Sequence, residues 1–184
     1  MHGAQAEARR QLITDGYQAL QAQFHQERED YGISGHKYAE LIQAVMETVG
    51  AESLLDYGAG KETLREALPQ YVVNSYDPAI EWLAQDPEPH DVIACTDVME
   101  HIEPDLTENV LDHIRGLSRK VVFFQIACRP AGKSLPDGRN AHINRKTPWE
   151  WLQLLAARWR VDNYQNFNDG AMIAVCSVPQ EDQA

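Results

Sequence analysis

The sequence has little that would direct the chain to a membrane. No apolar run approaches the roughly 18 residues of a membrane-spanning helix, and the N-terminal MHGAQAEARRQL lacks the apolar core of a signal peptide. Positive charge is also scarce, because 16 lysines and arginines face 28 aspartates and glutamates, for a net charge of −12. We therefore expect a cytoplasmic protein with no membrane partner, whose surface as a whole does not coat a nucleic-acid backbone.

Cysteine is scarce, and two common site motifs are absent. Cys95, Cys128 and Cys176 are far apart, each in or at the end of an apolar run, and none forms the C-x-x-C spacing of a zinc site. We expect buried, reduced thiols, which fit the cytosol. A phosphate-binding P-loop is excluded, because Leu55 stands where its first glycine belongs and Glu62 where serine or threonine belongs.

The pattern that is present favours one α/β domain over residues 1–184, with an N-terminal helical cap over 1–50 and a core over 51–184. Apolar stripes predict helices over residues 4–28, 36–49, 63–68 and 105–117 and from Thr147 onward. Short apolar runs predict strands over residues 53–57, 71–76, 91–96 and 120–127. Strands that alternate with helices predict a mainly parallel sheet with helices on both faces.

The two ends of this sheet differ. Residues 161–167 and 171–178, separated by Asn168-Asp169-Gly170, predict a C-terminal antiparallel hairpin. The connection from Asp77 to Asp91 is too short for a full helix and a further strand. We therefore expect one edge of the sheet to be trimmed, which means that it lacks the helix and strand that a longer connection would add there.

A glycine-rich turn follows the first predicted strand. It reads Asp56-Tyr57-Gly58-Ala59-Gly60, and glycine allows positive φ angles and a close approach of the backbone to a ligand. Asp77 ends the next strand, 21 residues after Asp56. A carboxylate there can accept hydrogen bonds from both ribose hydroxyls of a nucleoside. The alternative is a plain tight turn.

A second polar segment, Thr96 to Asp105 (TDVMEHIEPD), follows the third predicted strand. Together, LLDYGAGKETL, SYDPA and DVIACTDVMEHIEPD resemble class I S-adenosylmethionine-dependent methyltransferases. The resemblance covers residues 52–127 by motif and implies a Rossmann-like fold and methyl transfer from S-adenosylmethionine.

The resemblance also implies roles for individual residues. In such a family Asp56, Gly58 and Gly60 wrap the methionine part of the cofactor, while Asp77 holds the ribose. The implied cofactor contacts are Asp56, Tyr57, Gly58, Ala59, Gly60, Asp77, Pro78, Ala79, Thr96 and Asp97, with Ile80 beside adenine. The chain departs from the family at Glu62, where many members carry a third glycine. That side chain would either point away or crowd the cofactor carboxylate.

Asp97, Glu100 and His101 have a spacing that suits a metal site. If the segment is helical, positions i, i+3 and i+4 share one face, and oxygen and nitrogen ligands suit Mg²⁺ or Mn²⁺. His142 is the candidate for a fourth ligand. The set resembles the metal sites of small-RNA 3′-end 2′-O-methyltransferases and ubiquinone-type O-methyltransferases, in which the metal grips two neighbouring hydroxyls of the acceptor.

Alternatives to the metal remain open. His101 or His142 could be a general base without a metal, with Glu100 as a third catalytic candidate. Glu-His after this strand also occurs in methyltransferases that bind no metal, where it fixes a helix start or lines the pocket. The third alternative is that these residues have purely structural roles.

The predicted loop over 128–146 points to the acceptor. Residues 115–146 hold eight basic side chains and one acid, a local charge of +7 within an acidic chain. Arg139, Asn140 and Arg145 are the candidate substrate contacts, since arginine suits phosphate and carboxylate. We expect a small anionic acceptor such as a sugar or nucleotide, with an RNA end as the other option and a solvated loop as the non-functional alternative.

The N-terminal region and the tryptophans complete the expectations. Tyr31, His36, Lys37 and Tyr38 would form a lid over the cofactor, or the second helix would simply cover the sheet. At helical spacing, the tryptophans Trp149, Trp151 and Trp159 are expected to pack in the core. The sequence favours oxygen over nitrogen as the methylated atom. The remaining alternatives are metal-free methylation of a small molecule or protein side chain, and an inert cofactor-binding partner module.

Overall fold

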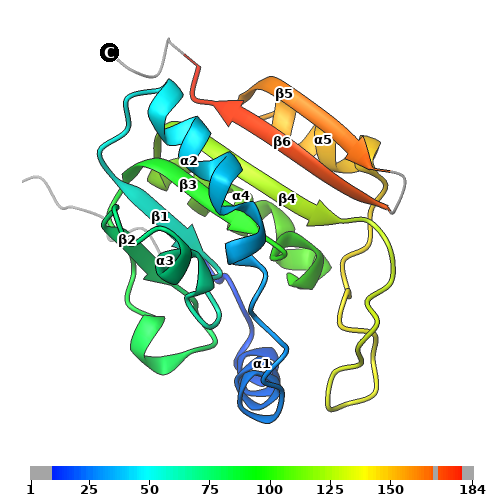
Figure 1. Ribbon diagram of the computed structural model, residues 1–184. Coiled ribbons are helices and arrows are strands. Elements are labelled where there is room, and N and C mark those ends of the chain that lie inside the picture. The colour runs from blue at the N-terminus through cyan, green and yellow to red at the C-terminus, as the bar shows by residue number, and fades with distance from the viewer. Residues whose placement is uncertain (1–9, 168–169, 180–184) are drawn as a thin grey trace, which may run out of the picture.

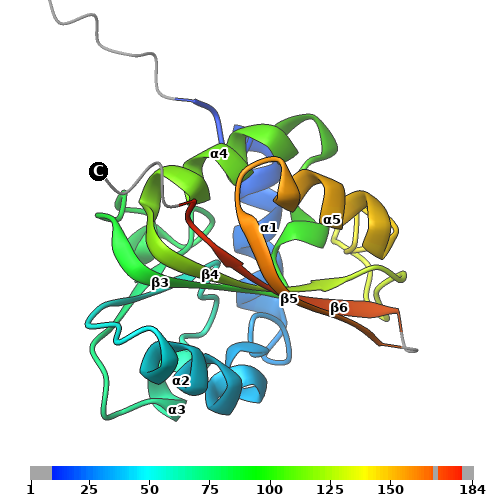
Figure 2. The same ribbon diagram turned by 90° about the horizontal axis from the view of Figure 1, so that it is seen from above.

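The fold is a six-stranded sheet with helices on both faces (Figures 1 and 2). The computed structural model describes residues 10–167 and 170–179. The strands are β1 (Leu54–Tyr57), β2 (Val73–Tyr76), β3 (His90–Thr96), β4 (Ser118–Ala127), β5 (Arg160–Phe167) and β6 (Ala171–Ser177). Their order across the sheet is β2-β1-β3-β4-β6-β5. The first four strands in the chain pair in parallel, and β6 is antiparallel to both β4 and β5.

The helices divide between the faces and one end of the sheet. They are α1 (Asp15–Glu27), α2 (Ala39–Thr48), α3 (Thr63–Ala67), α4 (Thr107–Leu117) and α5 (Pro148–Ala156). Short 3₁₀ helices span Gly35–Tyr38, Glu81–Leu83, Met99–His101 and Pro104–Leu106. In Figure 2, α4 and α5 cover one face while α2 and α3 cover the other. Within the described residues no helix is long and apolar enough to cross a membrane.

Two apolar layers hold the sheet between these helices. On one face Ile114 of α4 and Trp151 of α5 pack with Phe124 of β4. On the other, Ile42 of α2 packs with Phe123, the neighbouring residue of β4. The opposite faces of Phe123 and Phe124 follow from the alternation of side chains along a strand. Strand β4 is therefore central in the sheet and apolar on both faces.

The trimmed edge and the closing hairpin are confirmed as well. Between β2 and β3 the chain forms only the 3₁₀ turn Glu81–Leu83, and β2 is the edge strand of the sheet. The hairpin pairs Phe167 with Ala171. Its predicted turn residues Asn168 and Asp169 lie outside the described residues.

The N-terminal region differs from the expectation in two respects. The first helix begins at Asp15 rather than near residue 4, because Thr14 caps it by accepting a hydrogen bond from the Tyr17 N–H; residues 4–9 lie outside the described residues. In addition, α1 lies at the carboxyl end of the strands, whereas α2 packs on the sheet face (Figures 1 and 2). Only α1 is therefore placed to cover a site at that end.

Helix α5 starts as the sequence predicts. The Thr147 hydroxyl accepts a hydrogen bond from the Glu150 N–H (3.2 Å), and the Glu150 carboxylate accepts one from the Thr147 N–H (2.7 Å). This reciprocal capping box is the standard start of a helix. The helix turns Trp151 into the core, where Trp159 packs too, but leaves Trp149 64% exposed.

Trp151 and Trp149 offer a matched test of the core on one helix. Trp151→Ala should lower the free energy of unfolding by about 3–5 kcal/mol, because it leaves a large cavity between α5 and the sheet. Trp149→Ala should change it by less than about 0.5 kcal/mol, since its ring is mostly in water. Urea unfolding followed by circular dichroism measures both. Equal losses in the two variants would contradict this packing.

Candidate functional site

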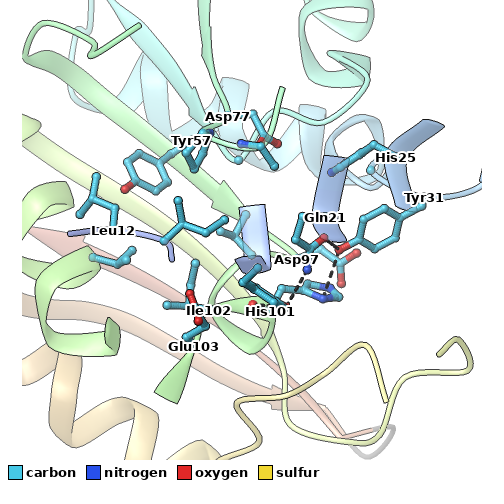
Figure 3. Close-up of a pocket in the computed structure, with 18 residues that line it drawn as sticks. Leu12, Gln21, His25, Tyr31, Tyr57, Asp77, Asp97, His101, Ile102 and Glu103 are labelled. Atoms are coloured by element: carbon cyan, nitrogen blue, oxygen red, sulfur yellow. Dashed lines mark hydrogen bonds between the residues drawn. The ribbon is translucent and has the colours of Figure 1, made fainter. Parts of the chain in front are cut away.

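A pocket lies at the carboxyl ends of β1, β2 and β3, beneath α1 (Figure 3). Tyr57, Gly58 and Asp77 line it from the strand ends, and His25 is among the α1 residues that line it from above. The register pairs Tyr57 with Tyr76, so β1 and β2 end side by side. Parallel pairing thus brings the glycine turn and the acid after β2 to one place, as the sequence predicted.

The glycine turn is shaped by close backbone contacts. Gly58 and Gly60 have φ angles of 77° and 52°. A Cβ at Gly58 would lie 2.4 Å from the Val98 side chain, and one at Gly60 would lie 2.6 Å from the Gly32 carbonyl oxygen. Both positions therefore require glycine for conformation and for space.

Asp77 is anchored at the base of the pocket. It is 7% exposed; Oδ2 accepts a hydrogen bond from the Gly60 N–H (3.1 Å) and Oδ1 one from the Ala79 N–H (3.0 Å). Burial raises the pKa of this carboxyl, although His25 and the two N–H groups oppose the shift. A carboxylate has about four lone-pair sites, so each oxygen can still accept a further hydrogen bond.

The other predicted cofactor residues divide into two groups. Pro78, Ala79 and Asp97 line the pocket. The predicted residues that do not line it are Asp56, Ala59, Gly60, Ile80 and Thr96. Ala59 packs with Ile80 and Leu83 instead. Burial, with Asp77 and Glu62 nearby, raises the pKa of Asp56 to about 7.

Glu62 points away from the pocket. Its carboxylate pairs with Arg65 at 2.6 Å, and it is not among the lining residues. Its φ angle is 56°, a left-handed conformation that glycine adopts most readily. The third glycine of the family pattern is therefore replaced by a strained residue, without crowding the pocket.

Asp97 is held in a sharp turn at the end of β3. Its φ angle is 61°, its N–H donates to the Gln125 carbonyl (3.1 Å), and its Oδ2 accepts from the Ser34 hydroxyl (2.8 Å). Burial would raise the pKa of Asp97, but the His101 ring and the Ser34 hydroxyl outweigh it and lower the pKa. Backbone strain of this kind is common at functional sites.

Asp97, His101 and His142 come together. One ligand atom from each lies within 4.8 Å of the others. The Nδ1 atom of His101 lies 2.8 Å from the Ala141 carbonyl oxygen, and Nδ1 of His142 lies 2.6 Å from that of Arg129. A carbonyl oxygen only accepts, so each Nδ1 carries a proton, and in the neutral ring Nε2 is the nitrogen that keeps the lone pair.

This arrangement fits a metal-binding group. Histidine ligands usually donate their second N–H to a carbonyl or carboxylate, which fixes the tautomer and the ring orientation. Burial also lowers the pKa of His101 well below its usual range, so its imidazole is neutral at pH 7. Two imidazole nitrogens and a carboxylate oxygen are an ordinary donor set for a divalent cation.

Glu100 lies outside this group. It is fully buried, and its Oε1 accepts a hydrogen bond from the Ala127 N–H at 2.6 Å. Its Oε2 has no hydrogen-bond partner within the described residues. Burial, and after it the nearby Asp97 carboxylate, raises the pKa of Glu100 well above the usual range. A shared face would require a helix that includes Asp97, whereas the 3₁₀ turn starts only at Met99. The face shared by i, i+3 and i+4 therefore does not exist here.

A second pocket adjoins the cluster through His142. Arg139, Asn140 and Arg145 line it, as expected of the loop over 128–146. The Asn140 amide, however, bonds to both the N–H and the carbonyl of Ala131 (2.9 Å each), so it shapes the loop. Arg139 pairs with Asp137 at 2.7 Å. Within the described residues, Arg145 forms no side-chain hydrogen bond or ion pair and is exposed.

One residue of the predicted lid lines the pocket, and three residues of α1 line it without having been predicted. Tyr31 of the predicted lid lines the pocket, and its hydroxyl donates to Gln21 at 2.9 Å. Gln21, Tyr17 and His25 were not singled out, because isolated polar residues within a helix carry no motif. His36 and Lys37 are not among the lining residues, and the Tyr38 ring packs against Phe123.

Sequence comparisons found no match among protein-family models or curated proteins. Solved structures do match. One is 1,6-didemethyltoxoflavin-N1-methyltransferase from Burkholderia thailandensis with bound 1,6-didemethyltoxoflavin and S-adenosylhomocysteine, at 18% identity and a TM-score of 0.65, covering 97% of this chain and 94% of that one.

Two further structures are more distant. Magnesium protoporphyrin IX methyltransferase from Synechocystis PCC 6803 with bound SAH is 16% identical (TM-score 0.58, 78% of this chain, 83% of that one). The methyltransferase domain of bacterial CtHen1-C is 13% identical (TM-score 0.58, 79% of this chain, 98% of that one). The chain therefore has the Rossmann-like fold of class I methyltransferases.

Proposed function

We propose that this protein transfers a methyl group from S-adenosylmethionine to a hydroxyl of a small anionic acceptor. The observation that carries the proposal is the placement of Asp77 at the base of a pocket, beside the glycine turn, with lone pairs left on both oxygens. The shared fold and the cofactor products bound in similar structures support it. Three free cysteines, two of them buried, are consistent with a reducing compartment such as the cytoplasm.

In this proposal the cofactor extends along the pocket from an apolar end to a polar end. Leu12 and Ile102 line the apolar end, and Pro78 and Ala79, which follow Asp77 in the chain, line the pocket as well. Adenine would lie there, with its ribose hydroxyls donating to Asp77. The sulfonium methyl would then face Asp97, at the wall that the pocket shares with the cluster.

The acceptor would enter through the second pocket. The cluster lies between the two pockets, since Asp97 and His101 line the first and His142 lines the second. Arg145 offers a cation with no partner in the described structure, and guanidinium groups bind phosphate and carboxylate well. A small sugar or nucleotide fits this single cation and the acidic chain better than a long nucleic acid; an RNA end remains the other candidate.

A divalent cation such as Mg²⁺ or Mn²⁺ would be held by Asp97, His101 and His142, with Glu100 behind them. When bound, such an ion makes a coordinated hydroxyl easier to deprotonate. The chain itself contributes orientation: the carbonyls of Ala141 and Arg129 hold both imidazoles with Nε2 free. Because the sulfonium methyl is already activated, in-line placement of the acceptor does most of the catalytic work.

Metal-free methylation is the second candidate. The same Nε2 lone pairs of His101 and His142 could accept the acceptor's proton directly. Glu100 is turned inward to the Ala127 N–H, which leaves three groups in the cluster within the described residues. An inert cofactor-binding module has less support, because Glu62 pairs with Arg65 and does not line the pocket, so it does not obstruct a cofactor there.

Asp77→Ala tests the cofactor assignment. We expect its affinity for S-adenosylmethionine to fall at least about 100-fold, because two hydrogen bonds to a charged group are lost. Isothermal titration calorimetry measures the affinity, and circular dichroism checks the fold. Asp77→Asn, which keeps the shape, should also bind weakly, whereas the exposed Glu81→Ala should bind like the wild type. Unchanged affinity in both Asp77 variants would show that the ribose assignment is wrong.

The metal is tested separately by titration with Mn²⁺, followed by electron paramagnetic resonance. His142→Ala should lower Mn²⁺ affinity by at least about 10-fold, because it removes a direct ligand. The matched control is His36→Ala, which changes an exposed histidine away from the cluster. If wild type and both variants take up Mn²⁺ equally weakly, the metal-free candidate is favoured.

A further inference from the structure

His25 is a pocket residue with unused hydrogen-bonding capacity. It projects from α1 into the pocket, with its ring 4.6 Å from that of Tyr31 (Figure 3). Its Nδ1 is buried and has no partner within the described residues. A buried polar atom without a partner is unfavourable, so a ligand that supplies the partner gains from the contact.

The glycine turn offers no N–H group for an anion. Such turns commonly bind anions through free backbone N–H groups. Here Gly58 and Ala59 both donate to the Tyr76 carbonyl, Gly60 donates to Asp77, and Lys61 donates to the Gly32 carbonyl (2.7–3.1 Å). The negative end of a ligand along this turn must therefore be met by a side chain.

Two cationic or donor side chains lie near this part of the pocket. Lys61 Nζ donates to the Arg28 carbonyl at 2.7 Å, and Lys61 is not among the lining residues. His25 does line the pocket and contacts Gly32, which in turn lies against Gly60. His25 is thus on the glycine-turn side, away from the apolar end at Leu12 and Ile102 (Figure 3).

The groups that face His25 are Asp77, Lys61, Tyr31 and His101. Burial lowers the pKa of His25, the carboxylate of Asp77 opposes that shift, and Lys61 adds to it. Whichever form is present, an imidazole keeps at least one N–H donor. The ring can therefore donate to a carboxylate at neutral pH.

From these contacts we infer that His25 binds the carboxylate of the cofactor's amino-acid end, as a donor that replaces the N–H groups of the glycine turn. The inference rests on the proposed function. It assigns the two ends of the cofactor to different residues: the ribose to Asp77 and the carboxylate to His25. A nucleoside that lacks the amino acid would not use His25.

His25→Phe is the decisive variant, because it keeps a ring beside Tyr31 and removes both nitrogens. Two ligands are titrated by calorimetry: S-adenosylhomocysteine, and 5′-methylthioadenosine, which has the same nucleoside but no amino acid. We expect the variant to bind S-adenosylhomocysteine about 10- to 100-fold more weakly and 5′-methylthioadenosine as the wild type does. Lys61→Met is the matched control and should bind both ligands normally.

The other outcomes overturn the inference in distinguishable ways. Equal weakening for both ligands would place His25 at the nucleoside or give it a structural role, and no weakening would remove it from the site. A selective loss in Lys61→Met instead would assign the carboxylate to Lys61. If the wild type binds neither ligand, the proposed function fails, and the inference fails with it.

Discussion

The site depends on the parallel pairing of β1 with β2 and β3. Residues separated by 20 or more positions meet because parallel strands end at the same edge of the sheet. The glycine turn then folds back so closely that no Cβ is tolerated at Gly58 or Gly60. In this turn the Gly60 N–H donates to Asp77 and helps to hold that carboxylate at the base of the pocket.

A hydrogen-bond network joins the pocket to the cluster of Asp97, His101 and His142. The Gln21 amide links the hydroxyls of Tyr17 and Tyr31 (2.6 and 2.9 Å), and the Tyr17 hydroxyl donates to the His101 carbonyl (2.8 Å). These side chains come from α1 and the turn after it, and they are buried. Helix α1 therefore both covers the pocket and holds the segment that carries His101.

Much of this architecture was predictable from local patterns. The capping box of Thr147 and Glu150, the doubly buried β4 and the closing hairpin all follow from short-range rules of spacing and capping. The position of Asp77 at the end of the second strand, beside the glycine turn, was also predictable, since strand ends and glycine turns can be recognised in the sequence. The tautomers of His101 and His142 were not, because they depend on carbonyls of Ala141 and Arg129.

The sequence by itself determined the strand and helix order, the glycine turn and the acid that follows the second strand, because these depend on neighbouring residues. Tertiary structure decided which side chains point into the site. It turned Glu100 inward to the Ala127 N–H, used Asn140 to brace the loop and brought His25 over the glycine turn. These positions depend on packing and hydrogen bonds between distant segments, and that of Glu100 also on the left-handed conformation of Asp97. A local sequence pattern records neither.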